Sequence, residues 1–161
     1  MDKNKAHYVV ATAIIIKDGR YLIARRSDKE TMMPGLWTVP GGKLEMSDYT
    51  SRKKDTGELW YNVIEDLLRR EVKEETCLEI DNIRYLTSMT FVRPDGTPTV
   101  VFSLFADHSG GSVVLSPELT DHAWVTLEEA KGYRLIDGIY DELVMLDKLL
   151  KGEKSAEWKR N

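Results

Sequence analysis

The segment LLRREVKEETCLEI, residues 67–80, carries three glutamates within five positions: Glu71, Glu74 and Glu75. Like charges at helical spacing repel one another, so this concentration needs a reason. At about 100° per residue, the three carboxylates continue the direction of an apolar stripe. The stripe comprises Trp60, Val63, Ile64, Leu67, Leu68 and Leu78. Carboxylates that share a buried direction require a cation, hydrogen bonds or raised pKa values.

The three carboxylates are suited to binding a divalent metal ion. Mg²⁺ and Mn²⁺ prefer oxygen ligands and commonly bind beside substrate phosphates, where they neutralise charge and can lower the pKa of a bound water. Arg70 lies at the edge of the stripe, where it could pair with Glu74 four residues later or orient a neighbouring carboxylate. The plain alternative is a solvated helix end, and the shared direction of the carboxylates makes it the weaker interpretation.

The rest of the sequence predicts strands and helices that position these residues. Helical spacing covers residues 57–78. Two hairpins are indicated, one within residues 8–26 around Asp18-Gly19 and one within residues 83–107 around Arg93–Gly96. Short strands are expected at 36–39, 112–115 and 122–125, and further helices at 127–133 and 138–150. This order predicts a mixed α/β fold and not a doubly wound parallel sheet.

Composition limits the classes of function. The net charge of −4 gives no support for a surface that binds nucleic acid, although a small anion could bind locally. The single cysteine, Cys77, excludes an internal disulfide and fits a reducing compartment. We find no signal peptide and no apolar run long enough to span a bilayer, which favours a soluble, cytoplasmic protein. We expect one domain over residues 1–161, with a polar tail at about 152–161.

A family resemblance rests on two linked motifs. REVKEETCL resembles the second half of the Nudix hydrolase box, G-x5-E-x7-R-E-U-x-E-E-x-G-U, in which U is apolar. Upstream, PGGKLE resembles the strand end and double glycine that open the box. The resemblance covers roughly residues 8–130. The matching positions of the second half are Arg70, Glu71, Val72, Glu74, Glu75 and Leu78.

The sequence departs from the box in two places. Cys77 replaces the last glycine, which suggests a differently shaped turn after the helix. Between Gly42 and Arg70 lie 70 − 42 − 1 = 27 residues where the box has 13, so the chain carries a 14-residue insertion at about residues 46–59. The box carboxylate that usually pairs with the box arginine could therefore be Glu58, although the spacing no longer identifies it.

The resemblance implies a Nudix-like α/β/α sandwich with a mixed central sheet, and a metal site. Glu71, Glu74 and Glu75 would hold Mg²⁺ or Mn²⁺, with the Gly41 carbonyl as a further ligand. Arg70 belongs to the same catalytic group.

The resemblance also implies a base and substrate contacts. The base that takes the proton of water is Glu71, or an acid of the loop before Trp124, namely Glu118 or Asp121. Because strand neighbours alternate, one of Arg25 and Arg26 should face the substrate, and the resemblance favours Arg26. Glu45 matches the first carboxylate of the box loop and is grouped with the substrate contacts.

Three functions remain open. The leading interpretation is a metal-dependent pyrophosphohydrolase that cleaves a nucleoside triphosphate, canonical or damaged, to a monophosphate and pyrophosphate. An ADP-ribose or nucleotide-sugar pyrophosphatase is the alternative, because some such members carry a proline about sixteen residues beyond the box, where Pro94 lies. The third is a domain that senses nucleotides without cleaving them, although such domains usually lose box carboxylates. The expected partner is a small nucleotide, with no nucleic acid or membrane, and a homodimer is left open.

Overall fold

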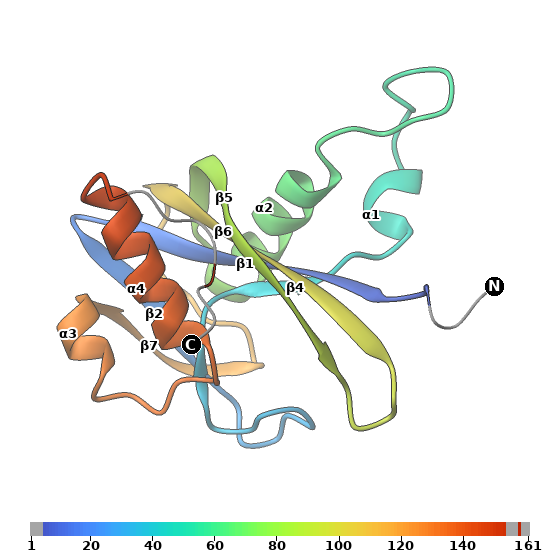
Figure 1. Ribbon diagram of the computed structural model, residues 1–161. Helices are drawn as coiled ribbons and strands as arrows, with labels where there is room; N and C mark the ends of the chain where they lie inside the picture. The colour runs from blue at the N-terminus through green and yellow to red at the C-terminus, as the bar shows by residue number, and fades with distance from the viewer. Residues whose placement is uncertain (1–4, 154–157, 159–161) are drawn as a thin grey trace.

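The computed structural model describes residues 5–153 and 158, and its centre is a mixed β-sheet (Figure 1). The strands are β1 Tyr8–Lys17, β2 Arg20–Arg26, β3 Trp37–Thr38, β4 Gly41–Lys43, β5 Glu79–Val92, β6 Pro98–Gly110 and β7 Leu119–Val125. The helices are α1 Ser47–Thr50, α2 Val63–Thr76, α3 Leu127–Ala130 and α4 Ile139–Leu150.

The sheet is built around β1. Its main path runs β3-β2-β1-β6-β5, while β4 also pairs with β1 and β7 pairs with β2. The β1–β6 pair is parallel and the other pairs are antiparallel, so the predicted mixed sheet is confirmed. The two predicted hairpins are β1–β2 and β5–β6. Because β4 pairs with Val10–Thr12, the double glycine is held against the middle of β1.

Helices cover both faces of the sheet. Alternate side chains of β1 point to opposite faces, so Ala11, Ala13 and Ile15 pack in one core and Ile14 in the other. The first core includes residues of α2, namely Leu67, Leu68 and Val72. The second includes residues of α4, namely Ile139, Leu143 and Leu146. The expected α/β/α sandwich is therefore confirmed.

The helix that carries the glutamates is shorter than the sequence indicates. It begins at Val63 and not at residue 57, because Asn62 adopts a left-handed conformation with φ of 56°. Trp60 lies outside the helix, where its ring centroid is 5.3 Å from that of Tyr49. Trp60 occupies a position where the helical period predicts an apolar residue, although the backbone of Trp60 is not part of the helix.

The end of α2 differs from the expectation in two respects. The strand predicted at residues 112–115 is wrong, because this segment is bound to the helix end: the Val114 amide donates to the Thr76 carbonyl and the Ser116 amide to the Glu75 carbonyl. Cys77 has φ of +60°, a left-handed conformation that the glycine of the box also adopts readily. The expectation of a differently shaped turn is therefore wrong.

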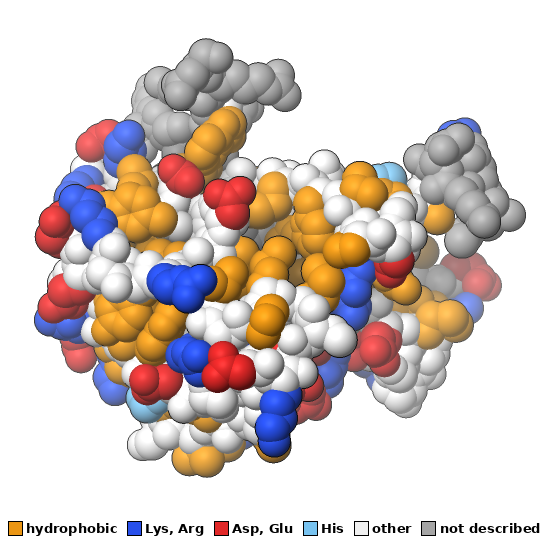
Figure 2. Space-filling view, turned by 90° about the horizontal axis from the view of Figure 1, so that it is seen from below, with side chains coloured by type: hydrophobic (Ala, Val, Ile, Leu, Met, Phe, Trp, Pro, Cys, Tyr) orange, Lys and Arg blue, Asp and Glu red, His pale blue; other side chains and the backbone are white. Residues whose placement is uncertain are grey.

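No helix in the described part of the chain is long and apolar enough to cross a membrane. On the face in Figure 2, the described acidic and basic side chains are interspersed with apolar ones and form no continuous basic band.

Candidate active site

The largely buried carboxylate of Glu75 lies against the double glycine. The Gly41 amide donates a hydrogen bond of 3.0 Å to Glu75 Oε2. Burial raises the pKa of Glu75 to about 8, although the Gly41 hydrogen bond acts in the opposite direction. The negative charges of Glu71 and Glu118 raise this pKa further, whereas the positive charge of Arg26 lowers it. The positive charge near Glu75 therefore does not offset the effect of burial on its pKa.

Glu71 lies one turn earlier and contacts the second glycine. A Cβ atom on Gly42 would lie 2.2 Å from the carboxyl carbon of Glu71, so only glycine allows this approach. Glu71 Oε1 lies 2.8 Å from Arg70 Nη2. Burial raises the pKa of Glu71 and the Arg70 charge opposes this. The carboxylates of Glu71 and Glu75 thus face adjacent glycines of β4.

Arg70 is the centre of an ion-pair network that includes one residue absent from the sequence predictions. Besides Glu71, its guanidinium contacts Glu74 at 2.8 Å and Asp48 of α1 at 2.9 Å. Asp48 is only 9% exposed and also accepts a hydrogen bond from the Glu45 amide. The network thus joins α1 to the helix that carries the glutamates.

The spacing of residues in the sequence is sufficient to identify Asp48 as a box position. Asp48 is the sixth residue after Gly42, which is the place of the first box carboxylate in G-x5-E. Glu58 is the wrong candidate, because its side chain is 86% exposed and pairs with Lys54. Counted from Asp48, the extra residues follow this carboxylate, since 70 − 48 − 1 = 21 residues precede Arg70 where the box has seven.

Glu74 does not share the buried direction of the other two glutamates. Its side chain is 59% exposed and is held by Arg70 four residues earlier. The prediction that all three carboxylates point toward the core direction is therefore wrong for Glu74. Its carboxylate lies at the solvent edge of the pair formed by Glu71 and Glu75.

The remaining predicted residues fall into two groups. Glu118 and Arg26 are close enough for their charges to act on Glu75, and the Ser27 amide donates to the Glu118 carbonyl at 2.8 Å. Arg25 instead pairs with Asp28 and donates to Thr120, and Asp121 stands opposite it in the β2–β7 ladder.

Arg26 and Glu45 each have local partners. The Arg26 guanidinium donates to Glu30 and to the Met32 carbonyl, which ties it to the loop after β2. Glu45 is exposed and lines a cavity of about 340 Å³ together with Ser47, Asp48, Ser51, Asp66, Leu67 and Arg70. Glu45 therefore lies on the α1 side of the site.

The donor set fits a divalent cation in its chemistry. The residues that the structure describes include no group of three or more His, Cys, Asp or Glu side chains already gathered at ligand spacing. However, burial raises the pKa of both Glu71 and Glu75, and the negative charge of Glu71 raises the pKa of Glu75 further. A cation between these carboxylates would lower both pKa values and favour their ionised forms. Glu71 and Glu75 would hold such an ion, and Glu74 could join them by leaving Arg70.

Comparison with known proteins gives consistent matches. The NUDIX domain family matches residues 7–144 of the chain. The nucleoside triphosphatase NudI of Escherichia fergusonii is 26% identical over 137 residues, which cover 78% of this chain and 86% of that protein.

Solved structures share the fold. The MutT NUDIX hydrolase of Burkholderia pseudomallei aligns with a TM-score of 0.69 at 23% identity, covering 88% of this chain and 99% of that one. The NUDIX domain of Shewanella oneidensis NrtR, solved in complex with ADP ribose, also aligns with a TM-score of 0.69, at 18% identity, covering 91% of this chain and 90% of that one.

Proposed function

The chain belongs to the Nudix family and is a hydrolase of phosphoanhydride bonds, and on this premise we propose that its substrate is a nucleoside triphosphate. The products would be a nucleoside monophosphate and pyrophosphate. The observation that carries the proposal is the buried Glu75 carboxylate, held at the Gly41 amide beside Glu71. Such a site is suited to a divalent cation bound between carboxylates and phosphate oxygens.

Nudix hydrolases generally use divalent metal ions, and we propose Mg²⁺ or Mn²⁺ here. The bound ion would neutralise phosphate charge and acidify an attacking water. Glu71 and Glu75, with Glu74 and the Gly41 carbonyl, would hold it, while Arg70 fixes the direction of the Glu71 carboxylate. Arg26 would contact the substrate from the loop side.

Two residues are proposed as the base that accepts the proton of the water. Glu71 lies against β4 at Gly42, and Glu118 acts on Glu75 from the loop before β7. Asp121 is the weaker candidate for the base, because it lies in β7 opposite Arg25 of β2.

An ADP-ribose or nucleotide-sugar pyrophosphatase is the second candidate. It is favoured by the likeness to the NrtR domain solved with ADP ribose. Pro94 adds little support, because it lies in the β5–β6 turn, where the Arg93 amide donates to Thr97 and the Gly96 amide to Arg93. NudI, of which this chain covers 86%, is named a nucleoside triphosphatase, and this favours triphosphates.

The test is a release screen with the purified full chain and Mg²⁺ or Mn²⁺. The substrates are canonical and oxidised dNTPs, ADP-ribose, nucleotide sugars and dinucleoside polyphosphates, and Glu75→Gln is the matched control. We expect turnover of dNTPs that is lost in the variant. Turnover confined to ADP-ribose would replace the triphosphate proposal with the second candidate. Nucleotide binding without turnover of any substrate would support a sensor domain.

Replacing Asp48 with alanine is expected to lower turnover about 10-fold, in the range typical of residues that orient metal ligands. Arg70 would lose its least exposed acidic partner and could turn away from Glu71. Steady-state turnover at saturating Mg²⁺ measures this loss. The matched control is Glu58→Ala, which removes the exposed candidate and should leave turnover within about twofold. Equal losses in the two variants would contradict the role of Asp48.

A further inference from the structure

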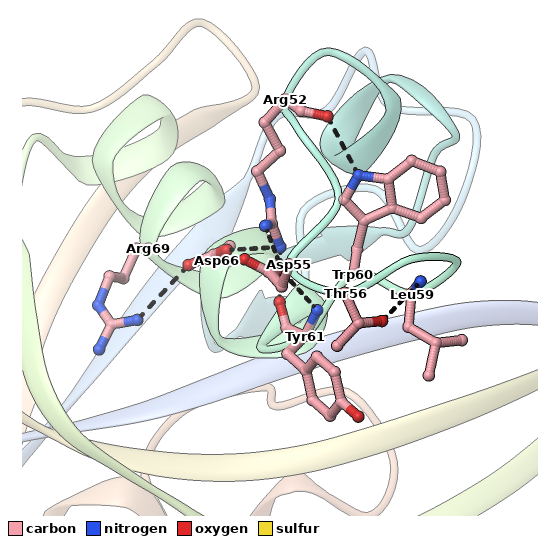
Figure 3. Close-up of polar contacts among 8 residues, drawn as sticks. All are labelled: Arg52, Asp55, Thr56, Leu59, Trp60, Tyr61, Asp66 and Arg69. Atoms are coloured by element: carbon pink, nitrogen blue, oxygen red, sulfur yellow. Dashed lines mark hydrogen bonds and ion pairs between the residues drawn. The ribbon is translucent and has the colours of Figure 1, made fainter.

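The segment 49–62, which follows Asp48 and contains the extra residues, is folded around one side chain. Arg52 Nη1 donates to Asp55 at 2.7 Å, and Arg52 Nη2 donates to the Tyr61 carbonyl (Figure 3). The Trp60 indole in turn donates to the Arg52 carbonyl at 3.1 Å. The Arg52 guanidinium therefore holds the two ends of this segment together, and we call the segment the insertion loop. A lysine could not make all of these contacts at once.

The insertion loop is also bound to the helix of the active site. Arg52 Nη2 lies 3.5 Å from Asp66 Oδ2, in the first turn of α2. Residues 61 and 66 stand on either side of Asn62, which begins the helix without a side-chain cap. A helix start that lacks a cap leaves amide groups unsatisfied and frays readily. Arg52 is a donor and satisfies none of these amides, but it holds the first turn from outside through the Asp66 carboxylate.

A second connection follows one helical turn further along. Asp48 pairs with Arg70 at 2.9 Å, and Arg70 holds Glu71. Asp48 and Arg52 are four residues apart, and so are Asp66 and Arg70. Each segment therefore presents one acid and one arginine, and each arginine meets the acid of the other segment. The two ion pairs, Asp48–Arg70 and Arg52–Asp66, thus join the segment of residues 48–52 to α2 at two successive turns.

We propose that Arg52 is a positioning residue for the metal-binding carboxylates. It acts by fixing the first turn of α2 through its ion pair with Asp66. When this ion pair is broken, the first turn of α2 moves away from the insertion loop. Arg70, one turn later, then loses the geometry that it needs to reach Asp48 and Glu71 together. This inference rests on the proposed function only for its effect on turnover, because the effect on the helix and on metal binding is independent of the substrate.

The experiment compares Arg52→Ala with Arg69→Ala in the full chain. Arg69 also approaches Asp66, at 3.9 Å, but it belongs to α2 itself and does not join the insertion loop to the helix (Figure 3). We expect Arg52→Ala to weaken Mn²⁺ binding about 10-fold, measured by electron paramagnetic resonance without substrate. Amide hydrogen exchange should accelerate in the first turn of α2, and kcat should fall more than KM rises. Arg69→Ala should change each quantity less than about twofold.

Two milder variants keep the inference testable if Arg52→Ala does not fold. Arg52→Lys preserves the charge but not the guanidinium, and Asp66→Asn preserves an acceptor but not the charge, so both should fall between wild type and Arg52→Ala. Folded variants with unchanged Mn²⁺ affinity and unchanged exchange would overturn the positioning role. Weaker Mn²⁺ binding in a protein that hydrolyses no triphosphate would retain it and refute the substrate proposal alone.

Discussion

Replacing Glu75 with glutamine is expected to lower hydrolysis on the order of 100-fold or more while making the metal-free protein more stable above pH 5. The variant keeps the shape of the side chain and an oxygen that can accept from the Gly41 amide. It loses the charge that a divalent ion requires. The opposite signs of the two effects are characteristic of a buried carboxylate retained for binding and not for stability.

The pH dependence of stability follows from the raised pKa of Glu75. In the metal-free folded state, Glu75 keeps its proton up to about pH 8, whereas its ordinary pKa is 4.5. The folded state therefore binds more protons than the unfolded state between these values, so the free energy of unfolding falls as the pH rises. One such proton gives a slope of at most about 1.4 kcal/mol per pH unit. The glutamine variant lacks this contribution.

Urea unfolding of wild type and variant between pH 5 and pH 8.5 measures the effect. Their difference isolates Glu75 from Glu71 and Glu142, whose pKa values burial also raises. Added Mg²⁺ should stabilise the wild type increasingly toward pH 8, because the ion binds the deprotonated carboxylate. It should stabilise the variant much less. Parallel pH curves for the two proteins would show that Glu75 is not held protonated in the fold.

The sequence was sufficient to predict the two hairpins of the sheet and the placement of Glu71 and Glu75 on one helix. The β-branched runs on either side of Asp18-Gly19 become β1 and β2, since alternation and turn residues act locally. Glu71 and Glu75 could be predicted because their spacing on α2 is fixed by the helix itself. These predictions depend on short-range geometry alone.

The start of α2 accounts for the error in the length of the helix, whereas Asp48 was missed because the count from Gly42 was not applied to it. The sequence pattern includes Trp60 in the apolar stripe of the helix, but Trp60 belongs to the insertion loop. Glu74 lies only about 20° from the buried Leu67 on the helix, so the helical period does not predict its exposure, which follows from the ion pair that holds it to Arg70. Periodicity cannot reveal that Asn62 turns left-handed, because asparagine tolerates that conformation but does not impose it.

Replacing Gly42 with alanine is expected to lower turnover about 100-fold with little loss of stability, because an ångström of misplacement in a site can have that effect. The new Cβ would lie 2.2 Å from the carboxyl carbon of Glu71. That carboxylate ends a flexible side chain, so it can move aside without disturbing the backbone. It would then leave the position beside Glu75 and break its contact with Arg70.

The neighbouring glycine provides a matched contrast. A Cβ on Gly41 would meet backbone atoms of β1, the Ala11 carbonyl oxygen at 2.3 Å and the Thr12 Cα at 2.8 Å. Gly41→Ala must therefore separate β4 from β1, and it should destabilise the fold by about 1–3 kcal/mol. Gly57→Ala, where a Cβ would meet no atom within 4 Å, should leave both turnover and stability unchanged.

Thermal unfolding and turnover, measured together on the three alanine variants, separate these effects. If Gly42→Ala retained full turnover, the Glu71 carboxylate would be free to act from elsewhere and the close approach to β4 would have no role in hydrolysis. If it lost stability as Gly41→Ala does, the second glycine would be required for strand pairing. A loss of turnover alone would show that the double glycine has two distinct functions: Gly41 lets β4 pair with β1, and Gly42 leaves space for the carboxylate that binds the metal.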